Sequence, residues 1–200
     1  MMKKIYTKPF CLAILCCAFV YGLALPFFWG NDPTQPTGTL SLLCEDKKLF
    51  FWIWGILMSG GINVNAQYMY RKFNYKNRLL DVLCVLAFVS MCFVALTLGH
   101  SIEDWNPKRL LHWIATGMFI AFCVLSVILF FLFNIKKRKD FIVPAIGVAA
   151  ILLTFVIIFV FLGKSAIMEM VPLAMLQILL FAVNFTPALK PDIKKECINV

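Results

Sequence analysis

Charged residues are scarce in this 200-residue chain: they make up 14% of it, against 62% for hydrophobic residues. A soluble globular domain has about a quarter charged residues. Several motifs of soluble catalytic and nucleotide-binding domains are also missing, because the chain has no C-x-x-C pair, no Walker loop, no G-x-S-x-G and no glycine-rich dinucleotide turn. The missing motifs exclude domains that are built on them. The scarcity of charge points to the membrane as the solvent of this chain.

Six apolar stretches are each long enough to cross a bilayer, which takes about 20 residues of α-helix. They cover Phe10–Trp29, Leu49–Tyr70, Leu79–Gly99, Leu110–Phe133, Phe141–Gly163 and Ala166–Leu189. Helices satisfy their backbone hydrogen bonds within one segment, and the alternating pattern of barrel strands is missing. The sequence therefore predicts an all-α membrane protein, a six-transmembrane-helix bundle that forms a single domain over residues 1–200.

The positive charge is divided unevenly between the two sides of this bundle, which carries a net charge of +9. Most of the 19 Lys and Arg residues precede the first segment, follow the last, or lie in the second–third and fourth–fifth connections. Positively charged loops stay in the cytoplasm. We therefore predict cytoplasmic N and C termini, membrane lipids as partners and no nucleic acid. The protein would be a multi-pass protein of the plasma membrane or an endomembrane, which the sequence does not distinguish.

The first apolar segment has a second interpretation, as a signal peptide. Lys3 and Lys4 precede a long apolar run over Cys11–Leu25, as in a signal peptide. No A-x-A-like cleavage site follows, and Pro26–Trp29 extends the run with an interfacial aromatic. We expect a retained first helix, and cleavage stays open as the alternative.

The second segment carries a polar stripe, which we define as Ser59, Asn63 and Gln67, spaced at i, i+4 and i+8. Amides that face lipid are costly, so the stripe is predicted to face the bundle interior. Gln177 and Asn184 of the sixth segment are its predicted mates. Two interpretations stay open: hydrogen bonding that holds helices together, or the lining of a polar path.

The same segment has small and aromatic residues at positions that predict its contacts. Gly55 and Ser59 form a small-xxx-small pair, which allows two helices to approach closely, either within the bundle or between two copies in a homo-oligomer. Aromatic residues near both ends of the segment are predicted to lie in the interfacial belts of the membrane. They are Trp52, Trp54, Tyr68 and Tyr70.

Ionisable residues gather on the extracytoplasmic side. His112 lies about 3 Å into the fourth segment and Glu169 about 4.5 Å into the sixth, at a rise of ~1.5 Å per residue, so the two can meet if these helices pack together. An ionisable residue in a membrane segment is a candidate functional residue, although a carboxylate in a first turn also complements the helix dipole. The predicted lipid head-group site adds four residues of the loop before the fourth segment: His100, Glu103, Asp104 and Trp105.

Three functions fit these features. The preferred one is a protein that binds, senses or helps organise membrane lipids through this site. The second is a small transporter or channel with a polar path lined by the second and sixth segments. Proton-coupled transport is disfavoured, because no charged residue lies at mid-membrane. The third is a membrane enzyme for lipid head groups or acyl chains. Its nearest hydroxyl in sequence is Ser165, four residues before Glu169, and we predict no catalytic residue, metal site or cofactor.

Three short runs give the chain a family resemblance. The polar second segment ends in Tyr70-Arg71-Lys72-Phe73, the fourth opens with Leu111-His112-Trp113-Ile114-Ala115, and the sixth opens with Ser165-Ala166-Ile167-Met168-Glu169. In these runs and their order the chain resembles the six-helix family of the damage-regulated autophagy modulators, the FRAG-type proteins and the GPI-anchor lipid-remodelling factor, with related bacterial proteins. The resemblance implies a membrane protein that handles, senses or organises lipids, on endomembranes or at a cell surface.

Overall fold

A computed structural model describes residues 6–30, 32, 34, 39–98, 107–163 and 165–189. Within these residues, six helices are long and apolar enough to cross a membrane, and no strand is present. The six are α1 (Lys8–Ala24), α3 (Lys48–Lys72), α4 (Arg78–Leu96), α5 (Pro107–Asn134), α6 (Ile142–Leu162) and α7 (Ala166–Phe185). The predicted all-α, six-helix bundle of a multi-pass integral membrane protein is confirmed. Which side faces the cytoplasm stays a prediction.

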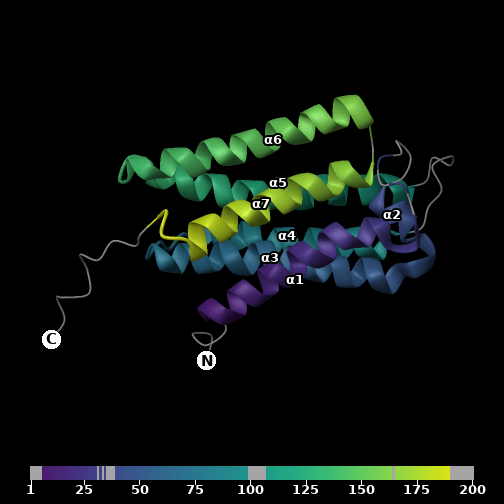
Figure 1. The fold of residues 1–200 in the computed structure, drawn as a ribbon, viewed down its shortest axis with the longest axis horizontal. Coiled ribbons are helices and arrows are strands. Elements are labelled where there is room, and N and C mark those ends of the chain that lie inside the picture. Colours follow the sequence, from purple (N-terminus) through teal and green to yellow (C-terminus); the bar gives the residue numbers. More distant parts are fainter. Residues whose placement is uncertain are drawn as a thin grey trace.

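The short elements lie between the spans, at the two ends of the bundle (Figure 1). They are η2 (Leu25–Gly30), α2 (Leu40–Leu43), η3 (Glu45–Lys47) and η4 (Lys139–Phe141). We call the end that holds α2 and the α6–α7 turn the α2 end. The opposite end, with the α3–α4 and α5–α6 turns, is the basic end, because its turns carry Lys76 and the run Lys136–Lys139.

Local chemistry sets where the helices begin and end. α7 stops at Phe185 rather than at the expected Leu189, because Thr186 precedes a proline and takes an extended conformation with φ −95° and ψ 162°. α6 ends at Gly163, whose φ of 62° is in the region that glycine tolerates best. The side chain of Ser165 then accepts a hydrogen bond from the backbone N–H of Met168 and caps α7.

α3 is the central helix of the bundle and packs against α1, α4, α5 and α7. Glycines allow two of these approaches. A Cβ atom added at Gly61 would lie 2.7 Å from the Cβ atom of Ala18 in α1, and one added at Gly55 would clash with the side chain of Met91 in α4. The small-residue pair of Gly55 and Ser59 is therefore used in close packing within the chain, and contact with a second copy through α3 stays a prediction.

An aromatic cluster closes the basic end. Phe130 of α5 has no exposed surface, and its ring centroid lies between 5.3 and 5.8 Å from those of five other rings. These rings belong to Tyr70, Phe73, Tyr75, Phe131 and Phe141. The guanidinium of Arg138 lies 4.9 Å from the centroid of Phe141 and 5.3 Å from that of Phe73. The cluster thus joins the α3–α4 turn to the α5–α6 turn.

Two of the four aromatic residues that were predicted to lie in the interfacial belts do not face the membrane. Trp54 and Tyr70 are buried in the bundle, and the Tyr70 hydroxyl donates to the Ser126 carbonyl oxygen at 2.6 Å. Residues two apart on a helix point about 200° away from each other, so a pair with this spacing cannot lie on one face. Trp52 and Tyr68, the other members of the two pairs, are half-buried.

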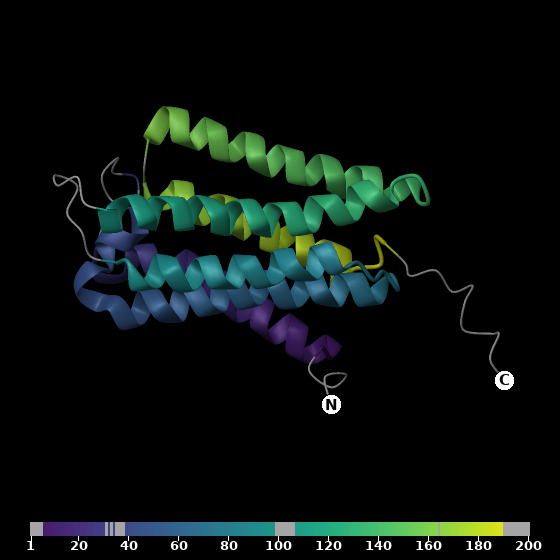
Figure 2. The ribbon, with the colours of Figure 1, turned by 180° about the vertical axis from the view of Figure 1, so that it is seen from behind.

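α6 lies on the outside of the bundle, beside α5 and α7 (Figures 1 and 2). Many of its side chains are exposed in the isolated chain, and Phe161 is 79% exposed. In a bilayer this surface meets hydrocarbon, which explains why α6 is apolar on all sides.

Candidate functional site

His112 of α5 and Glu169 of α7 line one small cavity at the α2 end of the bundle. The cavity has a volume of about 20 Å³, which is room for roughly one water-sized group. Its other lining residues come from α2, α3, α4, α5 and α7 and include Ser41, Trp54, Met91, Val94, Thr116 and Phe119. Both residues are half-buried. The predicted meeting of the two residues is thus seen as a shared cavity.

The carboxyl group of Glu169 connects α7 to the short helix α2. Its Oε2 atom accepts a hydrogen bond of 3.0 Å from the backbone N–H of Leu40, the first residue of α2. The first N–H groups of a helix have no partner inside that helix. Glu169 therefore caps α2 from a helix 129 residues away in sequence and holds this part of the loop against the bundle.

α2 packs tightly where Glu169 holds it. Leu40 and Cys44 have no exposed surface, and Ser41 lines the cavity. Burial raises the pKa of the Cys44 thiol to about 11, an effect that the nearby Lys47 opposes. The thiol is therefore protonated at neutral pH and shielded as long as α2 stays in place.

The hydrogen bonds around His112 define which ring nitrogen carries the proton. The Thr97 hydroxyl donates to the Phe93 carbonyl oxygen at 2.7 Å, so its oxygen is an acceptor toward His112 Nδ1 at 3.1 Å. The second neighbour of Nδ1 is the Val94 carbonyl oxygen at 3.2 Å, which can only accept. Nδ1 is therefore the protonated nitrogen, and Nε2 is the acceptor whenever the ring is neutral.

The cavity thus brings together the carboxyl group of Glu169 and the imidazole of His112, whose Nε2 atom is an acceptor when the ring is neutral. Such a pair suits a small group rich in hydrogen-bond donors. The four other residues of the predicted site lie outside the described residues: His100, Glu103, Asp104 and Trp105. Within the described residues, no group of three or more His, Cys, Asp or Glu side chains could hold a metal ion.

The polar stripe of α3 faces α4. The side-chain amide of Asn63 donates to the Ser59 hydroxyl at 3.1 Å within the helix. The amide of Gln67 donates to the carboxylate of Asp81 in α4 at 2.8 Å. Since Gly55, one turn before Ser59, also packs against α4, the stripe lies along the α3–α4 interface.

A second set of polar residues, which we call the α1–α3–α7 junction, was predicted only in part, because Gln177 and Asn184 were expected to contact the stripe. It consists of Cys11, Gly61, Asn65, Gln177 and Asn184. The Asn65 amide donates to the carbonyl oxygens of Cys11 at 3.0 Å and Gly61 at 2.8 Å, and the Asn184 amide donates to the Asn65 carbonyl oxygen at 2.9 Å. Gln177 and Asn184 thus contact a different face of α3 from the stripe. The one-turn spacing of Gly61 and Asn65 is the sequence signal that points to this face.

Comparisons with known proteins leave the function to be argued from this geometry. No family model matches the chain, and no curated protein or solved structure matches it. The resemblance to the autophagy-modulator family therefore stays a prediction.

The Glu169–Leu40 contact predicts how α2 responds to substitution. Glu169→Ala removes the acceptor, and losing a helix cap costs about 1 kcal/mol, so we expect the Cys44 thiol to react with a maleimide about fivefold faster. Labelling of the Cys44-containing peptide in purified protein, followed by mass spectrometry, measures this. Glu169→Gln is the matched control, because its amide oxygen still accepts from Leu40 and should leave the rate unchanged. Equal rates in the wild type and Glu169→Ala would contradict the capping role.

Proposed function

We propose that this integral membrane protein binds a membrane lipid whose head group places a primary ammonium group in the cavity at the α2 end. The observation that carries the proposal is the cavity itself, a space of about 20 Å³ lined by Glu169 and His112. An ammonium group carries three donors and no acceptor. It therefore complements a carboxylate and a neutral imidazole nitrogen, and its size matches a space for about one water molecule.

The same features select among head groups. A trimethylammonium group has no N–H donor and is larger than the cavity allows. A head group that adds a carboxylate is repelled by Glu169. A carboxylate has about four acceptor positions, so Glu169 can keep its bond to Leu40 while it pairs with a ligand. An ethanolamine head group meets all of these requirements.

Two other functions receive less support. A polar path between α3 and α7 conflicts with the direct contacts there, because the Asn184 amide donates to Asn65 and the Gln177 amide lies 3.3 Å from the Met58 sulfur. A hydrolytic enzyme needs an activated nucleophile. Ser165, the nearest hydroxyl to Glu169 in sequence, is fully buried and caps α7. Ser41, which lines the cavity, has its hydroxyl 3.0 Å from that of Thr39 rather than paired with a base.

The proposal predicts a lipid-dependent stability. Phosphatidylethanolamine should raise the melting temperature of the purified protein in detergent by about 3 °C more than phosphatidylcholine with the same acyl chains, because a ligand that binds the folded state stabilises it. Glu169→Gln removes the charge and keeps the α2 cap. His112→Ala removes the ring acceptor. Both variants should lose the difference between the two lipids.

Thr154→Ala is the control for this experiment. Thr154 lies in α6, and its hydroxyl donates to the Ala150 carbonyl oxygen within the same helix. This variant should keep the preference for phosphatidylethanolamine. Equal stabilisation of the wild type by the two lipids, or a full preference in both Glu169→Gln and His112→Ala, would refute the proposed site.

A further inference from the structure

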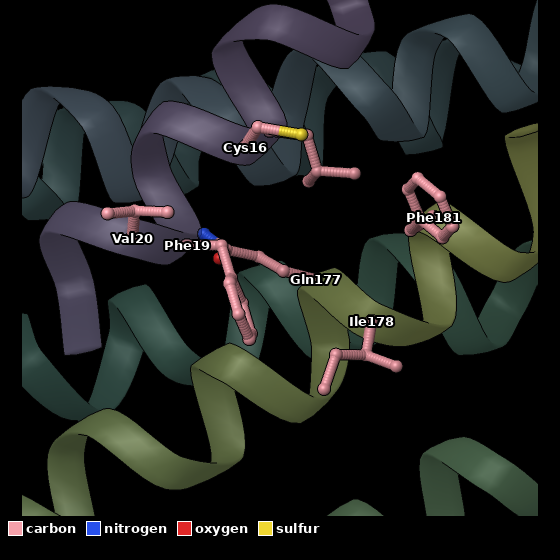
Figure 3. A pocket seen from close by; sticks show the side chains of 7 residues that line it. Cys16, Phe19, Val20, Gln177, Ile178 and Phe181 are labelled. Carbon is pink, nitrogen blue, oxygen red and sulfur yellow. The ribbon is translucent and has the colours of Figure 1, made fainter.

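A groove between α1 and α7 opens on the lipid-facing surface, and it shares no lining residue with the cavity at the α2 end. It has a volume of about 280 Å³. Figure 3 shows the side chains that line it from the two helices: Cys16, Phe19 and Val20 from α1, and Gln177, Ile178 and Phe181 from α7.

The depth of the groove limits what can occupy it. Gln177 lies about 16 Å along α7 at a rise of ~1.5 Å per residue, which is near the middle of a hydrocarbon core about 30 Å thick. No lining residue is charged. A charged head group would therefore lose its hydration without gaining a partner, so the occupant is an uncharged molecule with a hydrocarbon chain.

Gln177 is the one polar residue among the lining residues, and its amide is incompletely paired. The residue is 1% exposed, its Nε2 atom lies 3.3 Å from the Met58 sulfur, and its Oε1 atom has no hydrogen-bond partner in the described part of the chain. Figure 3 shows the Gln177 side chain extending from α7 toward α1. A buried amide oxygen without a donor is costly, above all where water is excluded.

We propose that this groove binds the chain of an uncharged lipid that carries a hydroxyl group, and that the hydroxyl donates to Gln177 Oε1. The apolar walls hold the chain, and the buried Gln177 Oε1 atom turns toward the groove to accept the bond. The inference does not depend on the site at the α2 end, because it uses other residues and another ligand class.

Photo-crosslinking of the purified full-length protein tests the inference. The two probes are a long-chain primary alcohol with a diazirine in its chain and the same chain without the hydroxyl. We expect the alcohol to label the α1 and α7 groove peptides about fivefold more efficiently than the alkane, since a hydrogen bond gained in an apolar medium is worth up to about a tenfold change in affinity. Equal labelling by both probes would overturn the role of Gln177.

Three variants separate the acceptor from the groove. Gln177→Leu removes the acceptor and should equalise the two probes while the alkane signal stays. Ile178→Trp fills the groove and should abolish labelling by both. Ile146→Trp places the same bulk on the lipid-facing surface of α6, where the side chain is 62% exposed, and should change neither. If Ile146→Trp lowers labelling as much as Ile178→Trp does, the groove is not the site.

Two neighbouring cysteines give a readout in the unmodified protein. Cys16 lines the groove, whereas Cys17 is not among its lining residues, and both are exposed. The unlabelled long-chain alcohol should protect Cys16, but not Cys17, from a membrane-soluble maleimide. This comparison needs no substitution, so it decides the question even if Gln177→Leu fails to fold. Equal protection of both thiols, or none, contradicts the proposal.

Discussion

Phe130→Ala is expected to lower the free energy of unfolding by about 3–5 kcal/mol, the usual cost of truncating a fully buried aromatic side chain. The Phe130 ring has no exposed surface and contacts five other rings. Loss of the ring leaves a cavity in the aromatic cluster that connects the α3–α4 turn to the α5–α6 turn. The α3–α4 and α5–α6 turns should then separate more easily, which unfolding in a mixed detergent or denaturant series would measure.

The control for this prediction is another phenylalanine with the opposite environment. Phe161 of α6 is 79% exposed and faces lipid, so Phe161→Ala should change the unfolding free energy by about 0.5 kcal/mol or less. A similar loss in both variants would show that the aromatic cluster at the basic end contributes no special stability.

The six spans could be predicted from the sequence because the bilayer imposes their length. A backbone in hydrocarbon must satisfy its own hydrogen bonds, so about 20 apolar residues in a row leave little choice but a helix. Local rules also hold at several ends. α5 begins at Pro107, which has no N–H to satisfy, and α7 begins after the Ser165 cap.

The arrangement of the helices could not be predicted in the same way. In a soluble protein the apolar face of a helix marks the core, but here the core and the surrounding lipid are both apolar. α6 shows the difficulty, because its lipid-facing Phe161 and its buried Val148 give the same hydrophobic signal. Polar residues say more about packing, because their spacing shows which face of a helix is buried. The spacing does not show which neighbouring helix covers that face. The stripe at Ser59 therefore lies along α4, while Gln177 contacts α3 on another face.

The candidate site was predictable in part. The helix rise predicted similar depths for His112 and Glu169, and the structure shows that both residues line one cavity. The bond from the Leu40 backbone to Glu169 had no sequence signal, because it joins residues 129 apart through a main-chain donor that every residue except proline has. The role of Glu169 in holding α2 therefore became visible only with the fold.

The second large effect is expected at Gly61, where α3 packs closely against Ala18 of α1. A Cβ atom at this position would lie 2.7 Å from the Cβ atom of Ala18. Neither atom can move by rotating a side chain, so Gly61→Leu must push the two helices apart. We expect a loss of about 3 kcal/mol, the upper part of the usual range for overpacking, with the Asn65–Cys11 hydrogen bond strained as well.

Gly117→Leu is the matched control, because a Cβ atom at Gly117 meets nothing within 4 Å. Leucine is also the better helix former, so this variant should be neutral or slightly more stable than the wild type. A smaller change at the contact gives the sharper test. Gly61→Ala adds only the clashing atom, and Ala18→Gly removes its neighbour, so the double variant should recover part of the stability that Gly61→Ala loses. If the two substitutions were simply additive, the close contact between these two positions could not be what holds α1 against α3.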